Sequence, residues 1–206
     1  MSQGRFITLE GGEGAGKSTL AQSLAASLKA RGRDVVVTRE PGGAAGADQI
    51  RKLLVEGGAD RWSPLEETLL FTAARLNHLN HTIRPALARG AVVICDRYLD
   101  STRAYQVAGG GVSIETLNAL SRLIEAPSPD VTLILDLDPS VGLQRSRGEH
   151  VGEDRFERKD AAFHARVRAA FHDIARAEPK RCVVIDASLG REAVASAALQ
   201  AIEAKL

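Results

Sequence analysis

The sequence predicts a three-layer α/β fold, in which a five-stranded parallel sheet lies between two layers of helices. Five short runs are continuously apolar and rich in β-branched residues, at residues 6–9, 35–38, 92–95, 131–135 and 183–185. Strands that are covered on both faces have this composition. Longer segments of helical character separate the runs. This alternation is typical of right-handed β-α-β units, which build a parallel sheet.

Glycine and proline mark the expected ends of the helices. The first helix covers residues 17–31 and stops at Gly32, which suits the left-handed conformation that follows many helices. A long helix covers residues 64–89, with Pro85 kinking or breaking it near its end. Further helices are expected over residues 114–125, 139–147, 161–177 and 191–204.

Length and composition favour one domain that spans residues 1–206, because 44% hydrophobic and 26% charged residues are close to the globular average. The net charge of +1 gives no reason to expect a nucleic-acid partner. No apolar stretch reaches the roughly 20 residues that a membrane span needs, so no membrane partner is expected. Cys95 and Cys182 lie inside apolar runs and are expected to be buried, which fits a cytoplasmic protein.

The first predicted strand ends in a glycine-rich turn. Residues 11–18 read GGEGAGKS, which fits G-x-x-x-x-G-K-[ST] between a strand and a helix. Glycines let backbone N–H groups approach phosphate oxygens, and the helix N-terminus adds a positive dipole. The sequence therefore predicts a P-loop NTPase fold that binds ATP, with Lys17 on the β- and γ-phosphates and Ser18 as a ligand of the cofactor Mg²⁺. The expected nucleotide contacts are Gly11, Gly12, Glu13, Gly14, Ala15, Gly16, Lys17, Ser18 and Thr19.

Four further segments carry polar and aromatic residues where an acceptor can bind. They read TREPGG at residues 38–43, FTAAR at 71–75, DRYLDSTRAYQ at 96–106 and DRFE at 154–157. Two of them follow predicted strands, and ligands of open α/β sheets bind beyond the carboxyl ends of the strands. The forked guanidinium of arginine suits a phosphate dianion. Phe71 precedes Arg75 by four residues, so the two side chains share one face of the helix.

Together with the P-loop, these segments resemble the thymidylate kinase family, whose motifs occur here in the same order over nearly the whole chain. The TREPGG and DRYxxSxxAYQ segments carry most of the resemblance, because related monophosphate kinases share the fold without them. The resemblance implies transfer of the γ-phosphoryl group of ATP to thymidine 5′-monophosphate (dTMP), which yields dTDP for dTTP synthesis. It also implies a homodimer built through the long helix.

The resemblance implies a role for each acceptor-site residue. Arg75 and Arg97 would hold the 5′-phosphate of dTMP, and Phe71 would stack on the thymine ring. Tyr105 would pack beside the deoxyribose, where a 2′-hydroxyl would clash. The polar residues Thr102 and Gln106 would read the pyrimidine edge or its surroundings. The remaining expected acceptor-site residues are Arg39, Glu40, Pro41, Arg51 and Ser101, and the Glu40–Pro41 peptide bond is a candidate for the cis form.

A short mobile lid is expected at about residues 146–158, because DRFE resembles the lid motif of the family. Arg155 is expected to stabilise the transition state, with Arg145 and Arg147 as alternatives. Gly14 stands where other family members carry an arginine, so that position supplies no charge here. The expected catalytic residues are Lys17, Arg97, Arg155 and Glu13.

The sequence leaves several alternatives open. Asp96 ends a predicted strand, where it either orients Mg²⁺ or fixes Arg97. Residues 186–188 are a candidate loop for adenine, and His78 with His81 is expected on the surface or at a dimer face. Another acceptor, or a P-loop switch without an acceptor, is a rival function. The N/T-K-x-D signature of guanine-reading switches does not occur in the sequence.

Overall fold

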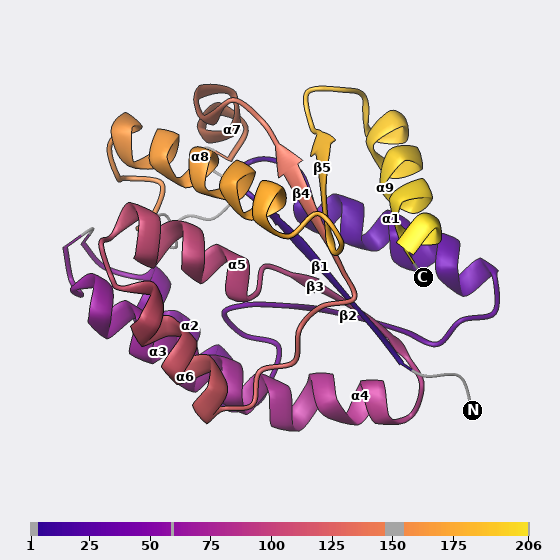
Figure 1. The fold of residues 1–206 in the computed structure, drawn as a ribbon, viewed down its shortest axis with the longest axis horizontal. Helices are drawn as coiled ribbons and strands as arrows, with labels where there is room; N and C mark the ends of the chain where they lie inside the picture. The colour runs from indigo at the N-terminus through magenta and orange to yellow at the C-terminus, as the bar shows by residue number, and fades with distance from the viewer. Residues whose placement is uncertain (1–3, 59, 147–154, 206) are drawn as a thin grey trace.

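A computed structural model describes residues 4–58, 60–146 and 155–205, and its ribbon is drawn in Figure 1. Its centre is a parallel sheet of five strands in the order β2-β3-β1-β4-β5. The strands are β1 (Arg5–Gly11), β2 (Val35–Arg39), β3 (Val92–Asp96), β4 (Val131–Asp136) and β5 (Cys182–Asp186). All four pairings between neighbouring strands are parallel. The sheet predicted from the apolar runs is therefore confirmed.

Helices cover both faces of this sheet and complete the three layers (Figure 1). On one face, α1 (Lys17–Ala30) and α9 (Arg191–Lys205) pack on alternate residues of the strands, such as Ile7 and Leu9. The opposite face receives α4 (Arg84–Ala88) and α8 (Ala161–Ala177). The remaining helices are α2 (Ala45–Val55), α3 (Pro64–His78), α5 (Leu99–Thr102), α6 (Ile114–Leu123) and α7 (Pro139–Ser146).

The long helix predicted over residues 64–89 is interrupted earlier than Pro85 suggests. A π-helical segment, Leu79–Ile83, separates α3 from α4. Pro85 is the second residue of α4, directly after the π-helical segment, and its missing N–H leaves a gap in the helical hydrogen bonds there. At its other end α3 begins with a capping box, in which Ser63 and Glu66 exchange hydrogen bonds with each other's backbone.

A second π-helical segment, Arg103–Gly109, continues α5. Neither α5 nor this segment was expected as a helix, because the motif residues here show no helical periodicity of apolar side chains. Of the lid expected at residues 146–158, residues 147–154 lie outside the described residues, Ser146 ends α7, and residues 155–158 form turns. No helix within the described ranges has the length and apolar character needed to cross a bilayer.

Candidate active site

A cleft with a volume of about 1240 Å³ opens beyond the carboxyl ends of the strands. Sites for one small ligand usually occupy about 300–1,000 Å³, so this cleft has room for two nucleotides. Its lining includes most of the residues that the sequence analysis selected, apart from Gly11, Gly12 and Arg155. These lining residues are Glu13, Gly14, Ala15, Gly16, Lys17, Ser18, Thr19, Arg39, Glu40, Pro41, Arg51, Phe71, Arg75, Asp96, Arg97, Ser101, Thr102, Tyr105 and Gln106.

The glycine-rich loop joins β1 to α1 at one wall of this cleft. Gly14 has a φ of +63°, and a Cβ atom added there would lie 2.0 Å from the carbonyl oxygen of Gly142. The loop therefore packs directly on the backbone of α7, and an arginine at position 14 would not fit. The N-terminus of α1 carries no side-chain cap, which leaves its backbone N–H groups available to an anion.

Lys17 lies over the glycine loop, and its Nζ donates to the carbonyl oxygens of Gly12, at 2.6 Å, and Gly11, at 3.3 Å. Burial is the main cause that lowers the pKa of Lys17 to about 8, and the charge of Arg97 acts in the same direction. The side chain still carries its positive charge for most of the time at neutral pH. A phosphate group placed here would therefore meet a largely desolvated cation.

Arg97 follows β3 and reaches the same glycine loop from the other side. Its Nη1 donates to the carbonyl oxygen of Gly11 at 2.9 Å, and its Nη2 lies 2.9 Å from Glu13 Oε2. Tyr105 contributes a second contact to Glu13, because its hydroxyl donates to Oε1 at 2.9 Å. The guanidinium also lies over the Tyr105 ring, 5.1 Å from the centroid. Glu13, Arg97 and Tyr105 thus form one unit at the mouth of the P-loop.

The charge of Glu13 is stabilised in this unit. Burial raises the pKa of Glu13, but the charges of Arg97 and Lys17 and the hydrogen bonds from Tyr105 and Arg97 outweigh burial and lower it to about 2. Glu13 is therefore ionised throughout the physiological pH range and has no proton to give. Its chemistry is to hold Arg97 and Tyr105 in place.

Ser18 and Asp96 place two oxygen ligands at the start of α1. The Ser18 hydroxyl donates to Asp96 Oδ2 at 2.5 Å. Hydroxyl and carboxylate oxygens are the ligand types that Mg²⁺ accepts, and this ion commonly takes only one or two ligands from the protein and the rest from phosphate and water. The residues present therefore fit a magnesium ion that accompanies a bound nucleotide. Within the described part of the chain, the Asp96 carboxylate forms no hydrogen bond or ion pair with Arg97, which favours the metal-side role of the two that the sequence left open.

Arg75 lies deeper in the cleft and is only 1% exposed. Its Nε donates to Glu40 Oε2 at 2.7 Å, and its Nη2 donates to Thr102 Oγ1 at 3.1 Å. Its charge is thus matched by Glu40, whereas Arg97 borders the P-loop. The two arginines, which the resemblance assigns jointly to the acceptor phosphate, thus have different partners in the cleft.

Glu40 is fixed by a residue that the sequence analysis placed elsewhere. His78 was expected on the surface or at a dimer face, but it is fully buried. Its Nδ1 lies 3.1 Å from Glu40 Oε1, and its Nε2 lies 2.6 Å from Thr38 Oγ1. The Glu40–Pro41 peptide bond is cis, as the sequence allowed. His78 therefore anchors the TREPGG segment to α3.

The remaining acceptor-side residues surround the space next to Arg75. Phe71 is partly buried, with its ring centroid 6.1 Å from that of Phe156. Gln106 donates through Nε2 to Glu67 Oε2 at 2.8 Å. Arg51 donates to the carbonyl oxygen of Pro41 at 3.0 Å, which ties α2 to the same wall. Arg39 ends β2 at the rim, with an exposed side chain.

The structure places Arg155 away from the cleft, against the expectation that it acts on the transferred phosphoryl group. Its side chain is 0% exposed, and its guanidinium forms an ion pair with Glu67 at 2.6 Å. The guanidinium also donates to the carbonyl oxygens of Gly58, at 2.9 Å, and Leu54, at 3.3 Å. These contacts give Arg155 a structural role, because it joins the segment after α7 to α2 and α3.

The last turn of α7 does line the cleft, and Arg145 in this turn contacts the loop after β5. Arg145 donates to the carbonyl oxygen of Ala187 at 3.4 Å, and Ala187 and Ser188 border the cleft together with it. The candidate adenine loop at residues 186–188 thus lies at the cleft in part, since Asp186 does not border it. Arg147, the other alternative, lies outside the described residues.

Three buried acids and bases of this region were not selected from the sequence: Glu10, Glu67 and His78. Glu10 ends an apolar strand, and Glu67 sits in the polar first turn of α3, so neither stands out by pattern. Only their burial and their contacts reveal them.

Comparisons with known proteins identify the family of this chain. A family model described as thymidylate kinase matches residues 9–198. A thymidylate kinase of Caulobacter vibrioides is 58% identical over 96% of this chain and 95% of its own length. One from Ruegeria pomeroyi is 49% identical over 94% of this chain and 92% of its own length.

A solved structure of a thymidylate kinase has the same fold as this chain. The crystal structure of thymidylate kinase from Ehrlichia chaffeensis superposes with a TM-score of 0.80 at 33% identity, covering 97% of this chain and 99% of that one. The motifs of the cleft, the match to the family model and these relatives lead to one conclusion: the chain belongs to the thymidylate kinase family.

Proposed function

We propose that the cleft binds ATP at the P-loop and dTMP on the side of Arg97, and that the γ-phosphoryl group passes directly from one to the other. One observation carries this proposal. Lys17 and Arg97, which come from different elements, both donate to the carbonyl oxygen of Gly11. The two cations therefore converge on a single point of the glycine loop, where the phosphates of donor and acceptor would meet.

The reaction needs positioning and charge compensation more than proton transfer. The acceptor oxygen belongs to a phosphate that is already anionic, so no strong base is required. The difficulty is the repulsion between two polyanions. Lys17 and Arg97 offset this repulsion in a largely buried site, where their charges act more strongly than in water. Glu13, which stays ionised, keeps the Arg97 guanidinium directed at the P-loop.

Ser18 and Asp96 are the residues that would hold the Mg²⁺ cofactor. An ion held there would supply positive charge that partly neutralises the phosphates of the nucleotide. The chain's own contribution is to set its two oxygens 2.5 Å apart at the N-terminus of α1, next to Lys17.

In this proposal the two acceptor arginines bind different parts of dTMP. Arg97 borders the P-loop and holds the 5′-phosphate of dTMP. Arg75 contacts Thr102, which was expected to read the pyrimidine edge, so we assign Arg75 to the far end of the acceptor. Phe71 supplies the ring that stacks on thymine. Tyr105 packs beside the sugar and disfavours a 2′-hydroxyl.

Arg145, at the end of α7, is the candidate for a further contact with ATP. It lies on the cleft wall, whereas Arg155 is anchored by Glu67. Its hydrogen bond to Ala187, in the candidate adenine loop, supports an assignment to the donor side of the cleft.

We also infer a homodimer, as the family resemblance implies. Large apolar side chains are exposed along α3 and on the neighbouring α2. Exposed apolar faces of this kind usually mark interaction surfaces. Leu65 and Leu69 are each 49% exposed, and Leu53 of α2 is 40% exposed. A symmetric dimer through this face would cover them. The free, buried cysteines and the bacterial relatives fit a cytoplasmic location.

A coupled assay of ADP release tests the substrate assignment. We expect turnover with dTMP to exceed turnover with dUMP, UMP, AMP, ribothymidine 5′-monophosphate and thymidine. Faster turnover of thymidine than of dTMP would show that Arg97 does not hold an acceptor phosphate. ATP hydrolysis that no monophosphate changes would favour the rival reading, a P-loop switch.

A further inference from the structure

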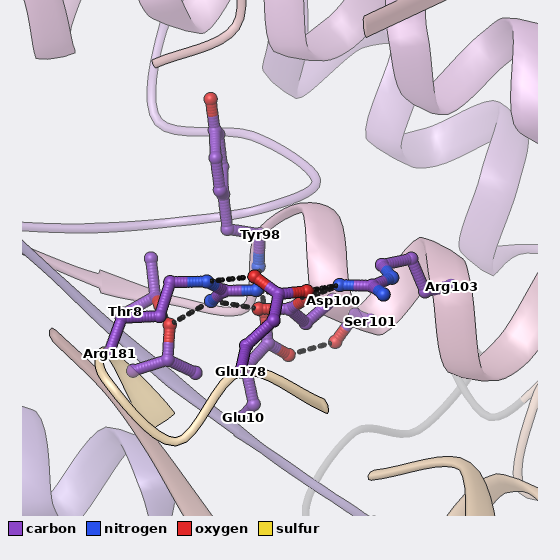
Figure 2. A network of polar contacts seen from close by, with 9 residues as sticks. Thr8, Glu10, Tyr98, Asp100, Ser101, Arg103, Glu178 and Arg181 are labelled. Atoms are coloured by element: carbon purple, nitrogen blue, oxygen red, sulfur yellow. Dashed lines mark hydrogen bonds and ion pairs between the residues drawn. The ribbon is translucent and has the colours of Figure 1, made fainter. Parts of the chain in front are cut away.

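Glu10 is a buried carboxylate that the mechanism above does not use. It lies near the end of the central strand β1 and shares one face with Phe6 and Thr8, because side chains alternate along a strand. It is 0% exposed. Its carboxylate accepts hydrogen bonds from the Tyr98 backbone N–H, at 2.9 Å, and from Ser101 Oγ, at 2.5 Å (Figure 2). Both of these donors are neutral, so neither brings a positive charge to the carboxylate. Burial of a charged group is costly, which suggests that Glu10 has a specific role.

Both donors flank Arg97. Tyr98 is the residue after Arg97, and Figure 2 shows its ring pointing away from the Glu10 carboxylate while its backbone nitrogen faces it. Ser101 donates to Glu10 and accepts a hydrogen bond from Arg97 Nη1 at 3.2 Å. One oxygen of Glu10 thus fixes the peptide that follows Arg97, and the other orients the hydroxyl that receives its guanidinium.

The backbone of Arg97 needs such support. Its φ is +66°, in the left-handed region that side-chain-bearing residues seldom adopt. The Arg97 N–H donates to the carbonyl oxygen of Leu9 at 2.9 Å, so β1 holds the residue on its other side as well. Loss of the hydrogen bond from the Tyr98 N–H to Glu10 would remove one of the contacts that hold the turn in this conformation.

We propose that Glu10 is a positioning residue for the acceptor: through Tyr98 and Ser101 it holds the Arg97 guanidinium at the P-loop. This inference rests on the proposed role of Arg97. Two oxygens that only accept are needed, since both partners are donors. An amide or a protonated carboxyl would turn a donor hydrogen toward one of them.

Asp100, which lies next to Ser101, belongs to a second group of charged side chains with Arg103 and Arg181. Asp100 accepts from Arg181 Nη1, at 2.7 Å, and Nη2, at 3.0 Å, and from Arg103 Nη1, at 3.1 Å (Figure 2). These ion pairs hold Asp100 in place, although its negative charge still raises the pKa of Glu10. Glu10 also interacts electrostatically with Arg97, Lys17, Arg75 and Cys95.

Steady-state kinetics of Glu10→Gln at about pH 8, above the pKa of about 7 that burial gives Glu10, test the inference, because the wild-type side chain is then mostly ionised and the substitution keeps the shape but changes one acceptor into a donor. We expect kcat/KM for dTMP to fall about 10–100-fold, the size of effect that a misplaced substrate-binding group causes. We expect KM for ATP to stay unchanged. Ile7→Val on the same strand is the control, since Ile7 is buried but makes no polar contact with Arg97.

A double-mutant cycle separates positioning from a general loss of structure. If Glu10 acts through Arg97, adding Glu10→Gln to Arg97→Ala causes no further loss in kcat/KM for dTMP. Ser101→Ala removes only one link and should give a smaller effect of the same kind, which keeps the test valid if Glu10→Gln folds poorly.

Three results would overturn the inference. Losses from Glu10→Gln that add fully to those from Arg97→Ala, or that affect ATP and dTMP equally, would show that Glu10 does not act through Arg97. Wild-type kinetics in both Glu10→Gln and Ser101→Ala would reject the positioning role of Glu10 but would leave the proposed role of Arg97 unaffected. Wild-type dTMP turnover in Arg97→Ala would instead reject the proposed acceptor site and this inference with it.

Discussion

Glu13 and Arg97 form an ion pair of 2.9 Å that joins the P-loop to the loop after β3. In the proposed function the pair would connect the donor half of the cleft to the acceptor half, because Glu13 belongs to the glycine-rich loop and Arg97 to the DRY segment. Both side chains are largely buried, with 21% and 17% of their areas exposed. Their charges are therefore poorly screened, and the position of Arg97 depends on the P-loop itself.

The central role of Arg97 predicts a selective defect in Arg97→Ala. We expect kcat/KM for dTMP to fall about 10²–10³-fold, the usual cost of removing one charge-stabilising group from an active site. Binding of ATP, followed by titration calorimetry, should persist because Lys17 and the loop amides remain. Arg97→Lys is the matched control: it keeps the charge but loses the fork, so partial activity is expected.

Arg155 and Arg145 are predicted to fail in different ways. Arg155→Met removes one partner of a buried ion pair with Glu67 and should lower the free energy of unfolding by about 3–5 kcal/mol. Arg145→Met, on the cleft wall, should leave stability nearly unchanged and raise KM for ATP. Urea unfolding and kinetics on both variants measure this. A stable Arg155→Met protein with a purely catalytic defect would instead show that Arg155 acts on the transferred phosphoryl group.

The buried position of Glu10 predicts how stability depends on pH. Burial, together with the charge of Asp100, raises the pKa of Glu10 from 4.5 to about 7. Between these two values the folded protein binds a proton that the unfolded chain releases, so this contribution to stability is present below pH 4.5 and is lost as the pH rises through 7. Glu10→Gln cannot titrate and should lack this decline.

Urea denaturation at several pH values between about 5 and 8 measures the effect as a difference between wild type and Glu10→Gln. Because other groups titrate in both proteins, only the difference reports on Glu10. A difference that stays constant across this range would show that Glu10 is not protonated in the folded protein near neutral pH.

The exposed leucines of α3 predict a dimer that charge would break. Leu65 and Leu69 are each 49% exposed, so a double substitution to glutamate should not harm the core. Sedimentation is expected to show a dimer for the wild type and a monomer for this variant. The control replaces Leu189, 52% exposed in the loop after β5, where no effect on assembly is expected. A monomeric wild type would remove this part of the proposal.

Much of the fold was predictable from the sequence, because the apolar runs and glycine stops reflect local physics. The helix expected over residues 161–177 is observed as α8 with the same bounds, Ala161–Ala177. The P-loop was equally readable, since its glycines and lysine follow one another along the chain. The segment after Asp96 was not, because its helix is stabilised by contacts with β1 that lie 88 and 91 residues away in sequence.

Two side chains near the site lie elsewhere than the sequence suggests, for the same reason. Arg155 sits in a charged stretch that reads as an exposed loop, and only the position of Glu67 on α3 shows that it is buried. His78 resembles a surface histidine of a helix, yet it bridges Glu40 and Thr38. Residue type and spacing indicate which chemistry is available, but long-range contacts decide which side chains reach the cleft.

Competition by a bisubstrate ligand tests the central claim, that both nucleotides share one cleft and meet at Gly11 between Lys17 and Arg97. The ligand is adenosine joined 5′ to 5′ to thymidine through five phosphates. Its inhibition is predicted to be competitive against ATP and also against dTMP. Competition against only one of the two nucleotides would contradict the account, because it would place the other outside this cleft.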